Sequence, residues 1–405
     1  MSYLNDTKQA GLKIIGSYRR RICTDVAAVY FAVVVFFPLN VFPQSPITNN
    51  YKSDSGLTKL TIQRSFIYEP VQQWLYSHHP HITFFKNKII AIWSNGMKDE
   101  DAPGQRVVYS TSTDFYNWSA PELLANPSVF DDTTLNVLTA AGFHITHDTL
   151  VAYYGEYSPE RSNTMLWAKT TTDGQHWSEP VNMHVPVNPN HGPQRLANGR
   201  LIISGNFTFP YTDDPSGLSG WKMSSFYPDS LYKEDNPATF YAPAEKLGLP
   251  PLCEGSFFQT GDHVIHALLR VTGDGWKGRL WLTESKDNGE HWSRPLETTF
   301  TDNDSKFHFG QLSDGRFYYV GIPDTLHHSD RNPLVLALSG DGKNFNKQYI
   351  VANSIYQLKK EGLWKEGQYG YPHTMIKDGW LYIIVSRQKE AVEILRLDLK
   401  QLSSK

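Results

Sequence analysis

Six hairpin signals at an even spacing constrain this 405-residue chain more than any other feature. At each one, a short apolar run of strand-forming residues ends at a turn and a second such run follows. Asn198-Gly199, Asp314-Gly315 and Asp378-Gly379 are dipeptides that favour tight hairpin turns. The six turns lie near residues 87, 148, 199, 262, 315 and 379, at intervals of 61, 51, 63, 53 and 64 residues. The chain is therefore predicted to repeat a hairpin unit of about fifty to sixty residues.

A second motif lies downstream of several of these hairpins. It starts with Ser or Thr, has Asp two residues later and ends in an aromatic residue, as in Ser112–Trp118, Thr171–Trp177, Ser285–Trp292 and, more weakly, Ser339–Phe345. The pattern resembles the Asp-box of sialidase-type propellers. In such a turn the Asp carboxylate accepts amide hydrogens, Gly supplies a positive φ and the aromatic ring packs between sheets. These Asp residues are therefore predicted to be structural, not acid catalysts.

Repeats of this length, without a convincing helix, predict an all-β fold, a β-propeller with six or seven four-stranded blades. Six inner hairpins are counted directly, and the long stretches between them have room for a seventh blade. Leu60–Glu69 is expected to be an outer strand that closes the ring against the C-terminal Glu393–Leu397. A β-sandwich is the alternative, which the even period and the Asp-boxes disfavour.

The N-terminal residues 1–45 are predicted to be a signal peptide, with the propeller domain covering 46–405. Arg19–Arg21 precede the apolar run Val26–Phe37, which is short for a span of about 20 apolar residues. Cleavage would remove Cys23 and leave Cys253 as the only cysteine. We expect an exported, periplasmic or cell-surface protein without a membrane span in the mature chain; an uncleaved membrane anchor is the alternative.

The charge balance narrows the class of ligand. Lys and Arg number 38 against 41 Asp and Glu, so the net charge is −3. A nucleic-acid binder would normally be basic, so nucleic acid is not expected as a partner. Aromatic residues make up 13% of the chain, and flat ring faces suit the C–H faces of sugars. A carbohydrate-active protein is therefore expected. The chain is also expected to be a monomer.

In a propeller the residues just before each inner hairpin converge on one face. Here they are Ser77–His81, Asn190–Arg195, Cys253–Ser256, Phe307–Gln311 and Tyr371–His373. Neutral His suits general acid or base catalysis near neutral pH, and Arg binds a substrate carboxylate in a bidentate way. The catalytic candidates are His79 and His78. The substrate-binding candidates are Tyr154, His191, Arg195, Glu254, Arg270, His308 and His373.

This combination favours a hydrolase or a lyase that acts on a uronic acid. No cofactor is expected, because the chain has no Gly-rich phosphate loop, G-x-S-x-G elbow or H-E-x-x-H motif. No metal site is expected either. His79 and His81 are close in sequence, but no H-x-H pair recurs with a carboxylate partner.

The segments Tyr76–Lys86, Ala91–Gly96 and Glu100–Arg106 resemble a clan of polysaccharide-active propellers. The clan holds the ulvan lyases and the exo-α-L-rhamnosidases of glycoside hydrolase family 145, and the likeness runs from about Ile67 to Leu397. It implies seven blades. It also implies that His79 matches a lyase His, while a second lyase His is replaced by Asp99, which argues against β-elimination.

The resemblance therefore favours a rhamnosidase that removes terminal L-rhamnose from α-1,4-linked glucuronic acid on plant arabinogalactan, by His-based catalysis. The alternatives are an ulvan-type lyase acting on plant or algal uronic-acid polysaccharides, and a non-catalytic glycan-binding propeller. The last is implied if Gln72 or Gln73 stands where active relatives carry His. A sialidase needs three Arg and a Tyr–Glu pair. Several Arg residues are present, but Ser77–His81 occupies the place where the first of the three is expected.

Overall fold

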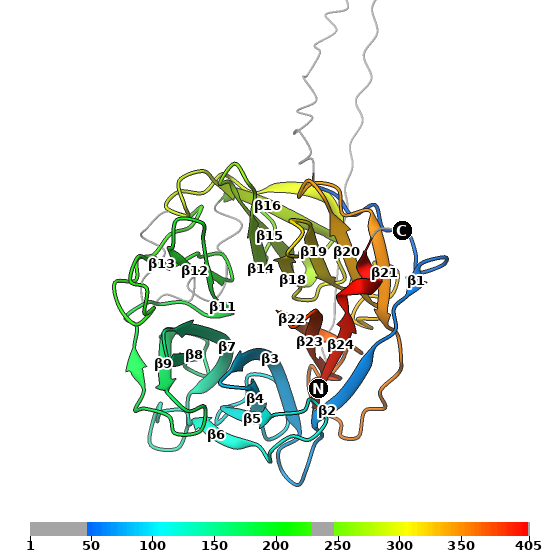
Figure 1. Cartoon of the computed structure of the whole chain (residues 1–405). Coiled ribbons are helices and arrows are strands. Elements are labelled where there is room, and N and C mark those ends of the chain that lie inside the picture. Colours follow the sequence, from blue (N-terminus) through cyan, green and yellow to red (C-terminus); the bar gives the residue numbers. More distant parts are fainter. Residues whose placement is uncertain (1–46, 228–246, 404–405) are drawn as a thin grey trace, which may run out of the picture. The chain divides into compact units, whose positions relative to one another are not determined.

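The computed structural model describes residues 47–227 and 247–403. The chain divides into two units, residues 1–42 and 43–405. The first unit and the whole predicted signal peptide, residues 1–45 with its apolar run, lie outside the described residues. In the second unit, six sheets surround a central axis (Figure 1). In the described ranges, no helix is long and apolar enough to cross a membrane.

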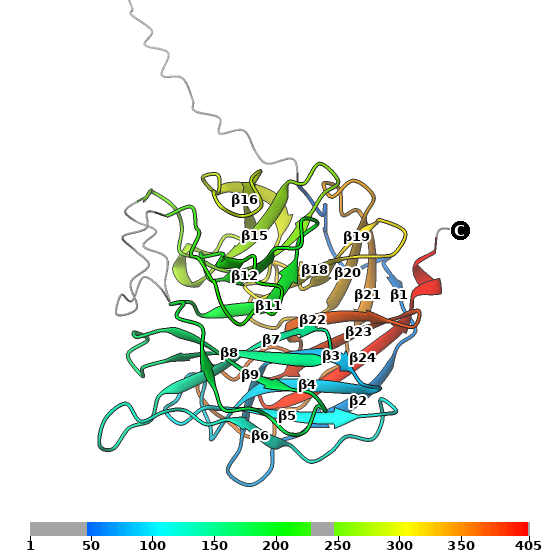
Figure 2. The same ribbon diagram turned by 60° about the vertical axis from the view of Figure 1, so that its left-hand side comes forward.

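The strands of each blade follow the chain from the axis outward (Figures 1 and 2). Blade 1 consists of β3 (Tyr76–Phe85), β4 (Lys88–Gly96), β5 (Arg106–Ser112) and β6 (Glu122–Ala125). Blade 2 consists of β7 (Val137–Thr146), β8 (Thr149–Tyr157), β9 (Met165–Thr171) and β10 (Val181–Asn182). The described part of blade 3 consists of β11 (Pro189–Arg195), β12 (Leu201–Gly205) and β13 (Tyr211–Thr212).

The second half of the ring has the same plan. Blade 4 consists of β14 (Leu252–Gln259), β15 (Ile265–Val271), β16 (Arg279–Ser285) and β17 (Leu296–Thr301), with the short 3₁₀ helix η3 (Gly273–Gly275) after β15. Blade 5 consists of β18 (His308–Gln311), β19 (Phe317–Gly321), β20 (Leu334–Ser339), β21 (Lys347–Ala352) and β1 (Thr58–Lys59). Blade 6 consists of β22 (Gly370–Lys377), β23 (Trp380–Arg387), β24 (Ala391–Asp398) and β2 (Gln63–Tyr68), followed by the 3₁₀ helix η4 (Leu399–Leu402).

The ring closes through strands from both ends of the described chain. β2 pairs antiparallel with β24, from Gln63 opposite Arg396 to Tyr68 opposite Val392. This confirms the predicted closure of Leu60–Glu69 on the C-terminal strand. β1 adds a second link, parallel to β21 in blade 5. The described residues form six blades, as the hairpin count indicates, and not the seven that the family resemblance implies.

The Asp-box turns have the predicted structural role. Asp173 Oδ1 accepts the amide hydrogens of Gln175 and His176, both at 2.8 Å, and Gly174 has a φ of +77°. Asp114 accepts the amides of Tyr116 and Asn117 in the same way, at 2.9 and 2.7 Å. These carboxylates are occupied by their own turns on the periphery of the blades, so they are not catalytic candidates.

Blade packing explains why the middle strands are so apolar. β4 and β23 are buried along almost their whole length, because each sheet is covered by a neighbouring blade on both faces. Trp93 on β4 is fully buried in a cluster with Tyr382 and Ile384 of blade 6. Such interlocking cores fix the blades and therefore the first residues of their inner strands, where the ionisable side chains gather.

Candidate active site

A polar cavity of about 280 Å³ lies at the end of the ring where the inner strands begin. We call it the Tyr371 cavity. Side chains from five of the six blades line it: His79, Glu100, Asp101, Thr139, Tyr157, Arg161, Asn188, Asn206, Cys253, Glu254, Arg270, Thr272, Trp364 and Tyr371. Segments far apart in the sequence therefore contribute to one site.

Irregular pairing at the starts of the inner strands helps to orient these side chains. β3, β7, β11, β14 and β22 each shift register against their second strand within the first few residues, for example between Gly370 and His373 on β22. His79 and Tyr371 have positive φ values of 53° and 53°. Bulges re-aim side chains and are common beside active sites. The same irregularity in five blades therefore turns polar residues toward the axis.

Tyr371, Glu254 and Arg270 form the centre of the cavity. The Tyr371 hydroxyl donates to Glu254 Oε2 at 2.6 Å, and Arg270 Nε donates to the same oxygen at 2.7 Å. Arg270 Nη2 lies 3.1 Å from the Tyr371 hydroxyl, and its Nη1 pairs with Asp304. All three side chains are buried. A phenol, a carboxylate and a guanidinium are thus held within hydrogen-bond distance of one another.

Burial raises the pKa of Tyr371 well above its usual value, so the phenol is neutral at pH 7. For Glu254, burial alone would raise the pKa, but Arg270 and then Lys306 lower it below its usual value. The carboxylate is therefore ionised and accepts the phenol hydrogen. This is the geometry of a nucleophile hydrogen-bonded to its base.

Glu100 and Asp101 form a second acidic wall on the loop between β4 and β5. Asp101 accepts hydrogen bonds from Tyr157 at 2.6 Å and from Arg161 at 2.9 Å. Burial, followed by the charge of Glu100, raises the pKa of Asp101 to about 6. Lys389 donates to Glu100 at 2.7 Å and helps to keep the pKa of Glu100 below its usual value. Asp101 therefore has the protonation behaviour of a general acid.

Two buried cations flank the Tyr371 ring. The Arg331 guanidinium carbon lies 5.5 Å from the ring centroid and Lys306 Nζ lies 4.8 Å from it. Arg331 is only 6% exposed, and its Nε and Nη1 have no hydrogen-bond partner within the described residues. Arg331 does not line the cavity itself. Since a buried guanidinium needs acceptors, it is a candidate to bind an anionic group that reaches past the Tyr371 ring.

The two catalytic His candidates lie at different depths. His79 lines the cavity, with Nδ1 3.1 Å from Ser94 Oγ. His78 is fully buried behind it, with Nδ1 2.6 Å from Ser386 Oγ and its ring centroid 4.0 Å from that of Tyr371. Burial, followed by neighbouring charges, lowers the pKa of both well below the usual value. His79 can contact a substrate as a neutral imidazole, whereas His78 supports the Tyr371 ring.

Of the seven predicted substrate-binding residues, Glu254 and Arg270 line the cavity. His191, His308 and His373 gather on the axis with His81, but do not line the cavity. The other two predicted residues lie away from the cavity. Tyr154 is buried in the core between blades 1 and 2. Arg195 lies at the far end of β11 and lines a different pocket, because a whole strand separates it from the Tyr371 cavity.

Three positions taken from the family resemblance also differ. Asp99 does not line the cavity, since its Oδ1 accepts the Leu363 amide at 2.6 Å; Glu100 lies in the cavity wall instead. Gln72 and Gln73 are exposed on the loop between β2 and β3 and do not line it either. A lost catalytic position at these two residues has no support in the cavity's geometry.

The sequence interpretation missed Tyr371, Asp101 and Arg331. Tyr371 belongs to a segment preceding an inner hairpin, and the Tyr–Glu requirement of sialidases could have pointed to it. Asp101 lies within Glu100–Arg106, one of the segments that carry the family resemblance. Arg331 lies between β19 and β20, where no local pattern marks it.

The fold and the cavity define a class of protein, a sialidase-like propeller with a buried Tyr–Glu–Arg centre. The family described as BNR repeat-like domain matches residues 87–383, and the chain belongs to that family. A search of curated proteins finds no match.

Several solved structures share the fold at low identity. A sialidase is 18% identical with a TM-score of 0.61, over 86% of this chain and 34% of that one. Trypanosoma rangeli sialidase in complex with sialic acid is 13% identical with a TM-score of 0.59, over 85% of this chain and 60% of that one. A protein of unknown function from Dyadobacter fermentans is 14% identical with a TM-score of 0.56, over 83% of this chain and 99% of that one. The chain spans about a third and three fifths of the two sialidases.

Proposed function

We propose that the chain is a glycoside hydrolase that removes a terminal sugar bearing a carboxylate from a glycan, with Tyr371 as nucleophile. The observation that carries this proposal is the 2.6 Å hydrogen bond from the Tyr371 hydroxyl to Glu254, within reach of Arg270. Sialidases are glycosidases in which Tyr replaces the usual carboxylate nucleophile. The low-identity likeness to sialidases supports the same class of reaction.

In the proposed reaction, Glu254 takes the hydroxyl proton while the Tyr371 oxygen bonds to the anomeric carbon. Arg270 Nη2, at 3.1 Å, stabilises negative charge on that oxygen. The bond from the anomeric carbon to the leaving oxygen breaks, and protonated Asp101 supplies the proton that this oxygen takes up. Water then bonds to the anomeric carbon while the Asp101 carboxylate takes one of its protons, the bond to the Tyr371 oxygen breaks, and Glu254 returns its proton to Tyr371.

The buried cations favour an acidic sugar. Arg331 has two unpartnered nitrogens beside the Tyr371 ring, and Lys306 lies on the same ring. A carboxylate next to the anomeric carbon, as in sialic acid, would lie close to both the nucleophile and Arg331. Trp364 is 66% exposed at the cavity wall and offers a ring face to the rest of the glycan.

A second candidate follows from His79, which lines the same cavity as Arg270. In this candidate His79 is the acid or base that releases L-rhamnose from a rhamnosyl–glucuronate terminus, and Arg270 faces the uronate. The two candidates separate by mutation, because the first requires the Tyr371 hydroxyl and the second requires the His79 imidazole. An unsaturated product would indicate β-elimination instead, and binding without turnover would indicate a glycan-binding protein.

The decisive experiment is covalent trapping. The purified protein is incubated with 2,3-difluorosialic acid and with an activated fluorinated uronosyl donor, then digested and analysed by mass spectrometry. We expect a glycosyl adduct on the peptide containing Tyr371, and none in the Tyr371→Phe variant. An adduct on another residue, or sugar release with full activity in Tyr371→Phe, would overturn the assignment of the nucleophile.

The proposal includes export to the periplasm or cell surface through residues 1–45, and a monomeric chain acting on plant, algal or animal acidic glycans. Fractionation of the native host with an antibody to residues 247–403 tests the location. Recovery of the protein with the cytoplasmic fraction would contradict it.

A further inference from the structure

Four His residues meet on the propeller axis, next to the Tyr371 cavity but outside its lining. His81, His191, His308 and His373 come from β3, β11, β18 and β22, in four different blades (Figure 1). The ring centroids of His191 and His308 are 4.8 Å apart, and those of His308 and His373 are 4.7 Å apart. One nitrogen from each of His191, His308 and His373 lies within 4.8 Å of the other two.

Hydrogen bonds leave one nitrogen of His191 without a partner. Its Nε2 lies 2.9 Å from the Phe307 carbonyl oxygen, which only accepts, so Nε2 carries the proton. Nδ1 therefore holds a lone pair, and this atom is buried without a hydrogen-bond partner among the described residues. His191 itself is 3% exposed. Metal-binding His commonly donates its second N–H to a backbone carbonyl in this way.

His308 has a similar supporting contact. Its Nδ1 lies 2.6 Å from Thr374 Oγ1, which in turn lies 2.8 Å from the Tyr318 hydroxyl. With Nδ1 held by a hydroxyl, Nε2 is the nitrogen left to bind an ion. His373 is the third side chain, and its Nδ1 accepts only a long 3.4 Å contact from the Ile82 amide. Both nitrogens of His81 instead face carbonyl oxygens, at 3.1 and 3.2 Å, so neither nitrogen is directed at the other three imidazoles.

We propose that His191, His308 and His373 bind a divalent transition-metal ion of the zinc type on the propeller axis. Three imidazoles with a fourth, open position are a recurrent zinc arrangement, and imidazole also suits Co²⁺ and Ni²⁺. The ion would join blades 3, 5 and 6. His308 and His373 follow Lys306 and Tyr371 by two residues, so the ion would also brace the floor of the Tyr371 cavity. This inference does not depend on the proposed function.

One buried charge beside the cluster opposes metal binding. Lys306 is the opposing charge, with Nζ 2.7 Å from the Asn190 carbonyl oxygen. Replacing Lys306 by an apolar residue should therefore strengthen metal binding.

The test measures metal directly, without any activity assay. The full chain without an affinity tag is stripped with a chelator and dialysed against Zn²⁺ or Co²⁺, and bound metal is measured by mass spectrometry. We expect about one ion per chain, and Co²⁺ absorption bands typical of low coordination. His191→Ala should lose the ion. His144→Ala is the matched control, since His144 is also buried and its Nε2 also contacts a backbone carbonyl, at 2.9 Å.

Two further variants keep the test decisive if His191→Ala does not fold. Thr374→Val removes the hydroxyl behind His308 and should weaken Co²⁺ binding by roughly 10–100-fold. Lys306→Met should bind Co²⁺ more tightly than the wild type. The proposal is overturned if the wild type takes up no metal, or if Thr374→Val and His191→Ala bind as the His144→Ala control does.

Discussion

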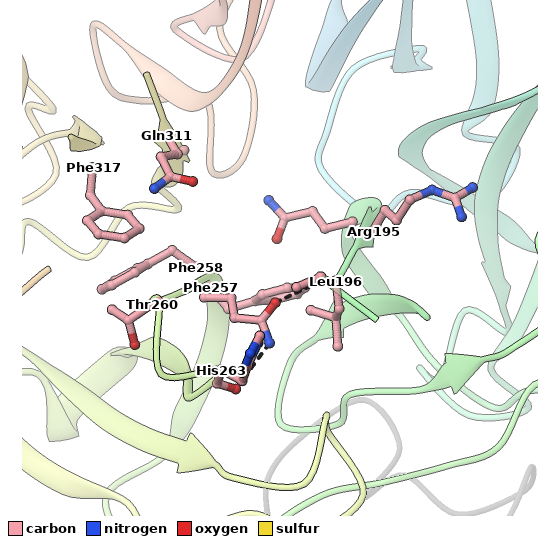
Figure 3. Close-up of a pocket in the computed structure, with 13 residues that line it drawn as sticks. Arg195, Leu196, Phe257, Phe258, Thr260, His263, Gln311 and Phe317 are labelled. Atoms are coloured by element: carbon pink, nitrogen blue, oxygen red, sulfur yellow. Dashed lines mark hydrogen bonds between the residues drawn. The ribbon is translucent and has the colours of Figure 1, made fainter. Parts of the chain in front are cut away.

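The molecule has cavities at both ends of its inner strands, and the larger of the two is not the Tyr371 cavity. The second, which we call the Arg195 pocket, has a volume of about 610 Å³, against about 280 Å³ for the Tyr371 cavity. It lies at the hairpin turns of blades 3, 4 and 5 (Figure 3). Its wall combines Phe257, Phe258 and Phe317 with long polar side chains. Size alone would select the Arg195 pocket.

Three long polar side chains of the Arg195 pocket bond to their own turns, and one of them, Gln259, also accepts the Ala197 amide of blade 3 at 2.9 Å. Arg195 Nη1 donates to the Gly199 carbonyl at 3.1 Å, Gln259 Nε2 to that of His263 at 3.1 Å, and Gln311 Nε2 to that of Gly315 at 3.0 Å. In three blades, the side chain therefore bonds to the carbonyl oxygen of the residue four positions later. These residues stabilise hairpin turns locally, so the pocket is explained by the fold.

In the Tyr371 cavity the polar contacts cross between blades. Tyr371 of blade 6 bonds to Glu254 of blade 4, and Arg270 of blade 4 bonds to Asp304, which precedes blade 5. Buried charges are costly unless they are paired, and unpaired buried groups are unusual in a structure that needs only to be stable. The comparison teaches that the candidate site is identified by charges held together by distant segments, beside two unpartnered nitrogens of Arg331, and not by volume.

The largest expected effect comes from Tyr371→Phe. Loss of the nucleophilic hydroxyl should lower kcat/KM for the acidic glycoside by on the order of 10⁴-fold or more. Tyr154→Phe, another buried Tyr, should retain activity within about twofold because Tyr154 is in the core and not in the cavity. Initial rates with a fluorogenic glycoside measure both. Equal losses in the two variants would mean that the cavity has no special role.

Asp101→Asn should have the next largest effect, a loss of about 10²–10⁴-fold in kcat. The pKa of Asp101 is about 6, and a general acid must be protonated. The rate of the wild type should therefore be highest below about pH 6 and fall roughly tenfold per pH unit above it.

The rate-against-pH profile provides the check on Asp101. In Asp101→Asn this alkaline fall should disappear, because the titrating carboxyl is gone. A wild-type rate that rises through pH 6 to 8 would assign Asp101 a different role. Substrates with a good leaving group, which needs no proton, should rescue the variant more than natural glycans do.

Much of the fold can be predicted from sequence, because its determinants are local. Turn dipeptides and the Asp-box pattern each act within a few residues, and the alternating apolar segments report burial directly. The six hairpins, the closing strand at Leu60–Glu69 and the structural role of Asp173 follow from them. The seventh blade was an inference from resemblance, and no hairpin signal supported it.

The site is only half predictable, because side-chain direction depends on strand irregularity. The rule that residues before a hairpin face the axis finds His79 and Glu254. On β22 it favours His373, but the register shift after Gly370 turns Tyr371 into the cavity and leaves His373 on the axis. The same rule does not place Arg195 at the Tyr371 cavity, because β11 begins at Pro189 and Arg195 is its last residue. Arg331 comes from a loop whose position is set by tertiary packing.

Arg331→Met should have a smaller effect, and it tests whether substrate binds at the Tyr371 end of the propeller and not at the Arg195 end. Losing a charge-assisted hydrogen bond to the substrate carboxylate should raise KM about 10–100-fold. Arg195→Met is the matched control and should leave KM unchanged. The effect should vanish with a substrate whose carboxylate is converted to an amide. An equal rise in KM for the acid and the amide would show that Arg331 does not contact the carboxylate.

The smallest effects are expected at the Arg195 pocket, and they should concern stability alone. Gln311 makes one bond to its own turn, whereas Gln259 also accepts the Ala197 amide of blade 3 at 2.9 Å. Gln311→Ala should therefore cost about 0.5 kcal/mol of unfolding free energy and Gln259→Ala about 1 kcal/mol. Both should keep the wild-type kcat/KM. Chemical denaturation and initial rates measure the two quantities on the same samples. If Gln259→Ala weakens substrate turnover while its stability is unchanged, the pocket has a ligand-binding role and the contrast between the two ends of the propeller fails.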